Sequence, residues 1–172
     1  MALKTISILG ATGSIGDSTL DLIRHHRDIY DVKVLTAGSN VEKLISLTHE
    51  FKPQYIAIDN QDHYQTLKSQ CPDVEIISIN EAASVESDWT MAAIVGTAGL
   101  KPTINAIKRG QIVAFASKEC LVAAGNIMMQ AVNNAGTKLL PVDSEHNAIY
   151  QVFEDYNRDT IRRLILTCSG GP

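Results

Sequence analysis

The sequence has 172 residues, 45% of them hydrophobic and 20% charged, so the chain can fold around a sizeable core and is not expected to be disordered. Its 15 Lys and Arg against 19 Asp and Glu give a net charge of −4 without a basic run, which argues against a nucleic-acid partner. The three cysteines are too far apart for a disulfide framework or a zinc site, and the apolar N-terminus is too short for a membrane span or signal sequence. We therefore expect a cytoplasmic protein.

Short β-branched runs alternate with amphipathic segments along the chain, a pattern typical of βαβ units that build a parallel sheet. Most runs are nearly continuous in apolar residues, which predicts strands covered by helices on both faces. The predicted strands are Thr5–Leu9, Val32–Ala37, Tyr55–Ile58, Glu75–Ser78, Met91–Val95, Ile112–Phe115 and Lys138–Val142. The predicted helices between them are Ile15–His26, Val41–Phe51, Asp62–Ser69, Lys101–Lys108 and Leu121–Asn134.

The pattern changes after the last of these strands, which predicts one domain over residues 1–142 and the beginning of a second over residues 143–172. The second part is expected to contain a helix around Ala148–Phe153 and a strand over Arg163–Cys168 that runs into a glycine turn. A strand in that position has nothing further to pair with, which suggests a piece of a longer protein.

The first strand leads directly into Gly10–Gly16, a GATGSIG loop that precedes a helix. In a GxxGxxG loop the glycines permit a tight turn, a close backbone approach to a pyrophosphate and close packing of helix on strand. The helix N-terminus then offers free N–H groups to phosphate. Glycine turns also join strands to helices for steric reasons alone, but the place of this loop in the first βαβ unit favours a dinucleotide site. We therefore expect a Rossmann-like, doubly wound, mostly parallel α/β sheet.

The end of the second strand bears on which dinucleotide would bind. NAD enzymes usually place an acidic residue there, whereas this chain has Gly38, Ser39 and Asn40 after Ala37. Small polar groups would not repel a 2′-phosphate, so NADP is favoured over NAD. Ser39 and Asn40 can equally begin the next helix, and Asn40 can do both.

Two polar clusters follow the last two strands of the sheet. In extended backbone Asp143 and Glu145 would point the same way and could share Mg²⁺ or Mn²⁺, although two carboxylates leave such an ion short of protein ligands. Spacing alone slightly favours the alternative, in which Asp143 or Ser144 caps a helix with Glu145 in its first turn. In the other cluster Lys118 could meet a phosphate or an anionic intermediate and Glu119 could lie near the nicotinamide, but the pattern alone favours a solvated loop with an N-cap.

Taken together, five segments resemble the 1-deoxy-D-xylulose 5-phosphate reductoisomerase family in order and spacing. They are GATGSIG (10–16), AIVGTAGL (93–100), ASKE (116–119), PVDSEHN (141–147) and SGGP (169–172). The resemblance spans the chain, and PVDSEHN is its most specific part, because a general dinucleotide domain has no reason to carry it. It implies that 1-deoxy-D-xylulose 5-phosphate is rearranged and reduced to 2-C-methyl-D-erythritol 4-phosphate with NADPH and one Mg²⁺ or Mn²⁺ ion.

The resemblance also implies residue roles and a homodimer when the protein is full length. Ser117 stands where the family usually has Asn, which puts its contact with the cofactor in doubt. Cys168 stands where the family often has Gly. A third metal carboxylate, a closing loop and a helical domain lie beyond residue 172 in the family, so this chain alone is expected to be inactive. The implied sets are metal ligands Asp143 and Glu145; catalytic Lys118 and Glu145; substrate contacts Lys118, Ser144, Glu145 and Ser169; and NADPH contacts Thr12, Gly13, Ser14, Ile15, Gly38, Ser39, Asn40, Ser117 and Glu119.

Two other hypotheses remain open. A different NADP-dependent dehydrogenase, acting on homoserine or an aspartate-derived aldehyde, would share the fold but need no divalent ion. A cofactor-binding module without chemistry would not depend on Asp143. Neither explains why the DSEHN segment accompanies the ASKE segment.

Overall fold

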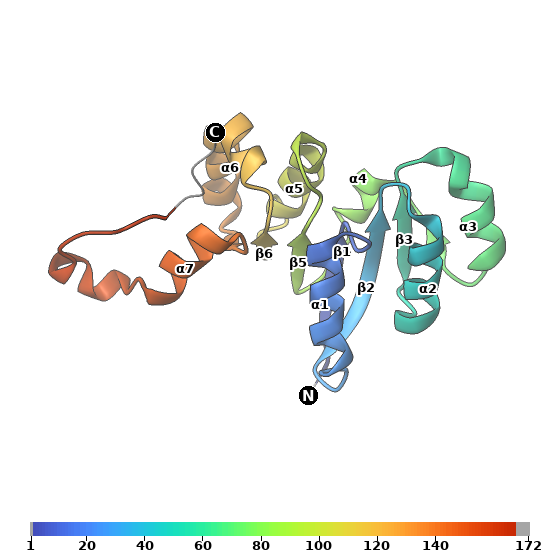
Figure 1. Ribbon diagram of the computed structural model, residues 1–172. Helices are drawn as coiled ribbons and strands as arrows, with labels where there is room; N and C mark the ends of the chain where they lie inside the picture. The colour runs from blue at the N-terminus through green and yellow to red at the C-terminus, as the bar shows by residue number, and fades with distance from the viewer. Residues whose placement is uncertain (1, 168–172) are drawn as a thin grey trace.

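The computed structural model describes residues 2–167 and contains a seven-stranded sheet in which all pairs are parallel (Figure 1). The strand order is β4-β3-β2-β1-β5-β6-β7, so the chain winds outward from β1 in one direction and then, from β5, in the other. The strands are β1 (Lys4–Leu9), β2 (Tyr30–Ala37), β3 (Tyr55–Ile58), β4 (Glu75–Ile76), β5 (Trp89–Ala92), β6 (Ile112–Phe115) and β7 (Lys138–Pro141).

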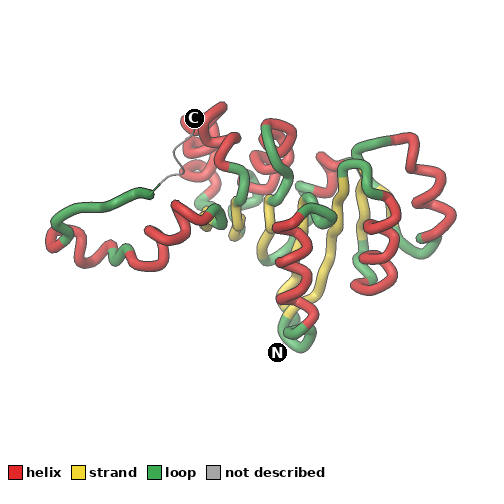
Figure 2. The backbone as a smooth tube through the Cα atoms, viewed as in Figure 1, coloured by secondary structure: helices red, strands yellow, loops and turns green. Residues whose placement is uncertain are grey.

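Helices cover both faces of this sheet (Figure 2). Side chains of α1, α2 and α3 pack with Ile6, Ile8 and Ile56 on one face, while α4 lies against Val34 and Ala57 and helices α5 and α6 against Val113 and Phe115 on the other. The helices are α1 (Ser14–Arg24), α2 (Val41–Phe51), α3 (Tyr64–Gln70), α4 (Ile79–Ala82), α5 (Leu100–Ile107), α6 (Lys118–Ala135) and α7 (Ser144–Val152), with 3₁₀ turns η1 (Gln61–His63), η2 (Thr97–Gly99) and η3 (Asp155–Thr160).

The predicted fold class is confirmed, because the sheet is parallel and doubly wound. The apolar runs that predicted strands buried on both faces are those that fill the core. Ile6, Ile8, Leu35 and Ile56 are fully buried. Complete burial of such a side chain stabilises the fold by about 1.5–3 kcal/mol relative to exposure.

One predicted strand is shorter in the structure, near β4. The strand predicted over Glu75–Ser78 ends at Ile76, because Ser78 caps the short helix α4. Its hydroxyl accepts from the Glu81 N–H at 3.2 Å while the Glu81 carboxylate accepts from the Ser78 N–H at 2.9 Å. This capping box was readable as Ser-x-x-Glu, but the β-branched run before it favoured a longer strand.

The part of the chain after β7 also departs from the prediction. The strand predicted over Arg163–Cys168 is wrong for residues 163–167, which form no strand, and residue 168 lies outside the described residues. A strand needs a neighbouring strand to satisfy its backbone groups, and within residues 2–167 this segment pairs with none: it lies off the sheet and runs back in the direction of α6 (Figure 1). Over residues 2–167, no helix combines the length and apolarity needed to cross a membrane.

Candidate functional site

The point where the strand order reverses lies between β1 and β5. Ligands of open parallel sheets bind beyond the carboxyl ends of the strands at such a switch point. The loop after β1 is the predicted glycine loop, and the segment after β5 begins with Ala93. A hydrogen bond from the Ala93 N–H to the Leu9 carbonyl, 2.8 Å long, holds the two segments side by side.

The glycine loop is held closely against its neighbours. Gly10 has a φ of +88°, a backbone conformation that favours glycine, and a Cβ there would lie 2.8 Å from the Ala93 carbonyl oxygen. A Cβ on Gly16 would lie 2.7 Å from the Cα of Ala11, so the third glycine permits close contact between α1 and the loop. At Gly13 the nearest atom would be 3.5 Å away, which leaves the helix N-terminus open.

A cleft of about 360 Å³ opens over this loop. The N-terminus of α1 faces this region without a side-chain cap at Gly13, so its first-turn N–H groups are available to an anion. The cleft is lined by Gly10, Thr12, Gly13, Thr36, Ala37, Gly38, Asp59, Ile79, Ala93, Ile94, Val95 and Ala98. Its lining includes glycines of the loop, which have no side chain, so a ligand could approach the backbone closely there.

The structure places three of the nine predicted cofactor residues in the lining of this cleft. Thr12, Gly13 and Gly38 line it, while the first turn of α1 contains Ser14, which is exposed, and Ile15, which is half-buried against the core. Ser39 follows Gly38 and is exposed. Asn40 caps α2 by accepting from the Lys43 N–H at 3.0 Å, so its capping alternative is confirmed.

Thr36 and Asp59 line the cleft, although the sequence pattern does not single them out. Thr36 accepts a hydrogen bond from the Gly10 N–H with its hydroxyl, at 2.9 Å, and another from the Ala11 N–H with its carbonyl, at 2.7 Å. Asp59 is the first residue after β3 and lines the cleft beside Gly38. The rule that ligands gather at the carboxyl ends of parallel strands would have indicated Asp59 once the strand order was known.

The predicted pair Ser117 and Glu119 lies at the start of α6. Ser117 is buried and its hydroxyl donates to Glu119 at 2.9 Å. The pKa of Glu119 lies below its ordinary value because of its backbone N–H and this hydroxyl. Lys118 and Glu119 are exposed in the first turn of α6, with Ser117 at the N-cap position, so the alternative is right about the cap position and the solvent exposure, although the two residues belong to a helix and not to a loop.

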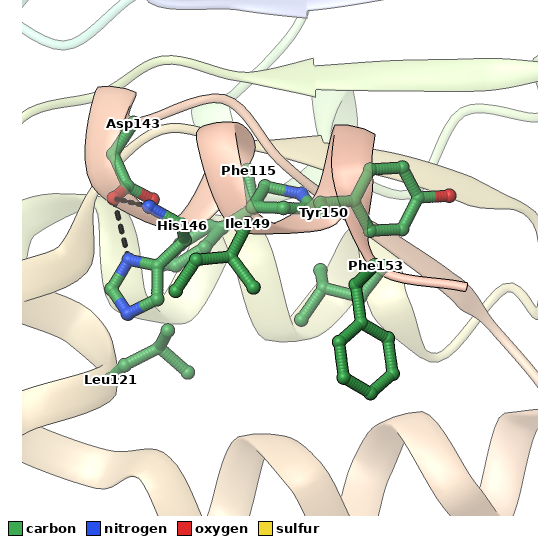
Figure 3. A pocket seen from close by; sticks show the side chains of 9 residues that line it. Phe115, Leu121, Asp143, His146, Ile149, Tyr150 and Phe153 are labelled. Atoms are coloured by element: carbon green, nitrogen blue, oxygen red, sulfur yellow. Dashed lines mark hydrogen bonds and ion pairs between the residues drawn. The ribbon is translucent and has the colours of Figure 1, made fainter. Parts of the chain in front are cut away.

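Asp143 is the N-cap of α7 (Figure 3). Its carboxylate accepts from the His146 N–H at 3.2 Å and lies 2.5 Å from Nδ1 of the same residue. Burial is the largest influence and raises the pKa of Asp143, but the hydrogen bonds from His146 together lower it below its ordinary value. Asp143 is therefore an anion at neutral pH and one of its oxygens is already engaged.

The geometry expected for Asp143 and Glu145 is wrong in one respect. The extended backbone ends at Asp143, and Ser144 and Glu145 already belong to α7, so strand alternation does not align the two carboxylates. Glu145 instead lies 3.6 Å from the Lys118 ammonium. Within residues 2–167, no three His, Cys, Asp or Glu side chains gather in a way that could hold a metal ion. The role of these two acids as metal ligands stays a prediction.

An apolar cavity of about 570 Å³ lies between α7 and α6 (Figure 3). It is lined by residues from the N-terminal part of α7, from α6 and from the ends of strands β6 and β7. The residues around it are Phe115, Leu121, Leu139, Pro141, Asp143, His146, Ile149, Tyr150 and Phe153.

Comparison with known proteins identifies the chain's relatives. Residues 6–125 match the family described as 1-deoxy-D-xylulose 5-phosphate reductoisomerase, and residues 139–172 match the C-terminal domain of that enzyme. The chain belongs to this family. A reductoisomerase of Nitrobacter winogradskyi is 48% identical over 99% of this chain, which spans 43% of that protein.

Solved structures of the family have the same fold. The Zymomonas mobilis reductoisomerase in complex with NADPH is 48% identical, with a TM-score of 0.90 over 94% of this chain and 44% of that one. A DOX-P reductoisomerase in complex with NADPH, fosmidomycin and magnesium is 42% identical, with a TM-score of 0.86 over 91% and 40%. The chain therefore spans less than half of the relatives it matches.

Membership in this family confirms the resemblance drawn from the five segments and disfavours the two other hypotheses. Four of the five family segments lie within the residues that the structure describes. The predicted substrate contact Ser169 belongs to the fifth, SGGP, which lies outside the described residues. The four described segments all follow strands β1, β5, β6 and β7, so they meet at one edge of the sheet.

Proposed function

We propose that this chain forms the dinucleotide-binding part of an NADPH- and divalent-metal-dependent reductoisomerase that converts 1-deoxy-D-xylulose 5-phosphate to 2-C-methyl-D-erythritol 4-phosphate. The observation that supports it most is the juxtaposition of the open cleft over Gly10–Gly13 with the clusters after β6 and β7 at one edge of the sheet. Two solved relatives are complexes with NADPH, one of them also with fosmidomycin and magnesium.

The residues of the cleft would bind and orient the cofactor. The free N–H groups at the start of α1 would hold the pyrophosphate, with Thr12, Gly13, Ser14 and Ile15 around it. Gly38, Ser39 and Asn40 would receive the adenosine end, since they follow β2. Ser117 and Glu119 would lie toward the nicotinamide, where the Ser117 hydroxyl holds the carboxylate in place. When bound, NADPH supplies the hydride.

The residues beyond β6 and β7 would serve the substrate. Lys118 is an exposed cation that can attract its phosphate or a developing negative charge, and Ser144 is exposed one residue after the cap. Asp143 and Glu145 would hold Mg²⁺ or Mn²⁺. Two carboxylates suit such an ion, because Mg²⁺ commonly binds one or two protein carboxylates together with water and substrate oxygens. A bound ion would polarise the substrate oxygens.

The division into a dinucleotide-binding domain over residues 1–142 and the beginning of a catalytic domain over residues 143–172 is part of this proposal. So are the sugar-phosphate partner, the homodimer of the full-length protein and a cytoplasmic location. The direction in which α7 leaves the sheet supports the division, because α7 has no buried residue among those described and packs mainly beside β7 (Figure 1).

Titration of the 172-residue chain with NADPH, followed by the fluorescence of the reduced nicotinamide, tests the cofactor role. We expect saturable binding, and no consumption of NADPH when 1-deoxy-D-xylulose 5-phosphate and Mn²⁺ are added. A folded chain that does not bind NADPH would overturn the proposed cofactor role. Turnover would overturn the expectation that residues outside this chain are needed.

A further inference from the structure

The start of the glycine loop is held against the end of β2. The pairing of β1 with β2 ends at Ile8 and Leu35, and the next residue of β2 is Thr36, which is fully buried. The Thr36 hydroxyl accepts from the Gly10 N–H at 2.9 Å, and the Thr36 carbonyl accepts from the Ala11 N–H at 2.7 Å. Thr36 therefore contacts the peptide groups on both sides of Gly10.

These two contacts fix the direction in which the loop leaves the strand. A peptide group is planar, so holding the Ala11 N–H also sets the direction of the Gly10 carbonyl in the same plane. That carbonyl accepts from the Gly13 N–H at 3.2 Å, and Gly13 is the N-cap of α1. Thr36 is thereby connected, through Gly10, to the helix N-terminus proposed to hold the pyrophosphate.

A side chain makes only one of the contacts that hold the start of the loop. The bond from the Ala93 N–H to the Leu9 carbonyl joins backbone to backbone, as do those of Ala11 and Gly13. Any residue can make such backbone contacts, whereas the bond to the Gly10 N–H needs the Thr36 hydroxyl. A side chain without oxygen would leave that N–H facing an apolar atom at a fully buried position, where an unmade hydrogen bond is costly. We expect the loop to shift in response.

We propose that Thr36 is a positioning residue of the dinucleotide site, which sets the glycine loop in its binding conformation before the cofactor arrives. The inference rests on the proposed function, because it concerns the same cleft. A loop that is already ordered loses little conformational freedom when a ligand binds, which favours affinity. Thr36 acts through Gly10, without a contact of its own to the cofactor.

The test compares two ligands that differ in whether they carry a pyrophosphate. NADPH has one, whereas adenosine 2′-phosphate has only the adenosine end. Thr36→Val keeps the approximate shape of the side chain but removes the hydroxyl. It should weaken NADPH binding by roughly tenfold and change the dissociation constant of adenosine 2′-phosphate by less than about twofold. Fluorescence titration measures the first constant, and NMR titration of the isotope-labelled chain measures the second.

Two further variants separate the hydroxyl from general damage to the core. Thr36→Ser keeps the hydroxyl and should bind NADPH within about threefold of the unmodified chain. Thr48→Val is the matched control, because Thr48 is also buried and its hydroxyl donates to the Leu44 carbonyl inside α2. It should leave both dissociation constants unchanged. Circular dichroism establishes that each variant is folded.

Hydrogen exchange on the unmodified chain tests the same point without a substitution, and it decides the matter if Thr36→Val does not fold. The Gly10 amide should be protected before NADPH is added, to an extent comparable with the amides of β1, because Thr36 already holds it. A Gly10 amide that is unprotected in the free chain, and becomes protected only with NADPH, would overturn the positioning role.

The binding results distinguish this role from the function on which it rests. If Thr36→Val binds NADPH as tightly as Thr36→Ser does, or loses affinity for both ligands equally, the positioning role of Thr36 is overturned and the proposed function stands. If the folded, unmodified chain binds no NADPH, both are overturned.

Discussion

The Lys118 ammonium lies 3.6 Å from a carboxylate oxygen of Glu145. This contact joins the segment after β6 to the segment after β7, and it brings together two residues for which catalytic roles are proposed. Both remain partly exposed, with 54% of the Lys118 side chain and 31% of that of Glu145 accessible. Exposed ion pairs at this distance are weak, so each residue is free to exchange its partner for a ligand.

The first prediction is that this pair contributes little to stability. Lys118→Met and Glu145→Gln should each change the free energy of unfolding by less than about 0.5 kcal/mol, since exposed pairs contribute only about 0–1 kcal/mol. Urea denaturation of both single variants and the double variant gives the coupling energy. A coupling above about 2 kcal/mol would show a structural pair and weaken the proposed roles of both residues.

The second prediction separates two roles of Asp143. Because its side chain caps α7, Asp143→Ala should destabilise that helix by about 1 kcal/mol, whereas Asn is an equally good cap and Asp143→Asn should cost a few tenths at most. Hydrogen exchange of the α7 amides measures the difference. If Asp143 is also a metal ligand, Asp143→Asn should weaken Mn²⁺ binding while exchange stays unchanged.

The third prediction concerns two glycines of the loop. A Cβ at Gly16 would meet backbone atoms of Ala11 at 2.7–2.8 Å, whereas one at Gly13 would make an ordinary contact at 3.5 Å. Gly16→Ala should therefore destabilise the fold by about 1–3 kcal/mol through overpacking. Gly13→Ala should stay folded but bind NADPH more weakly, because its methyl group would stand at the helix N-terminus proposed to hold the pyrophosphate. Thermal unfolding and NADPH titration distinguish the two, and a fully stable Gly16→Ala variant would contradict the packing argument.

The fourth prediction is a pH dependence at the C-terminal ends of α1 and α2. Glu50 accepts from Arg24 at 2.6 and 2.8 Å and from Arg27 at 3.2 Å. The hydrogen bond from Arg24 is the largest cause that lowers the pKa of Glu50 below its ordinary value of 4.5. Stability from a lowered pKa is fully present above the ordinary value and is lost as pH falls through the folded-state pKa.

Glu50→Gln should therefore remove about 0.5–1 kcal/mol at neutral pH and flatten the loss of stability in acid. Urea denaturation at several pH values measures both effects. Glu75→Gln, at an exposed carboxylate of β4, is the control. Parallel acid profiles for Glu50→Gln and the unmodified chain would argue against the Arg24 contact.

The fifth prediction concerns Arg109, which joins the turn before β6 to the segment before β5. Its guanidinium donates to the carbonyls of Val85 and Ser87 and to the hydroxyls of Ser87 and Thr90. Burial lowers the pKa of Arg109. Arg109→Ala would leave several acceptors unpaired and should cost about 2–4 kcal/mol, and Arg109→Lys should not restore it, because one ammonium cannot reach all of them. Lys108→Ala, at the exposed neighbour, should stay within about 0.5 kcal/mol in the same denaturation experiment.

Much of the secondary structure follows from local patterns. The helix over Val41–Phe51 and the strands over Tyr55–Ile58 and Ile112–Phe115 have the predicted bounds, because apolar periodicity, caps and turns act within a few residues. The strand predicted over Arg163–Cys168 is wrong over its described residues for the complementary reason. Its β-branched and leucine-rich run favours a strand, but a strand forms only where another offers its backbone groups.

The sequence by itself determined the α/β class, the glycine loop and, through its five segments, the family. Only the tertiary structure decided the strand order, and with it that the loop after β1 lies beside Ala93 and that Asp59 lies beside Gly38. It also decided that Asp143 caps α7 rather than continuing an extended strand. Local motifs depend on side chains a few positions apart, whereas the edge of a sheet gathers residues from distant turns of the chain, and only hydrogen-bonded pairing and core packing select which of them meet.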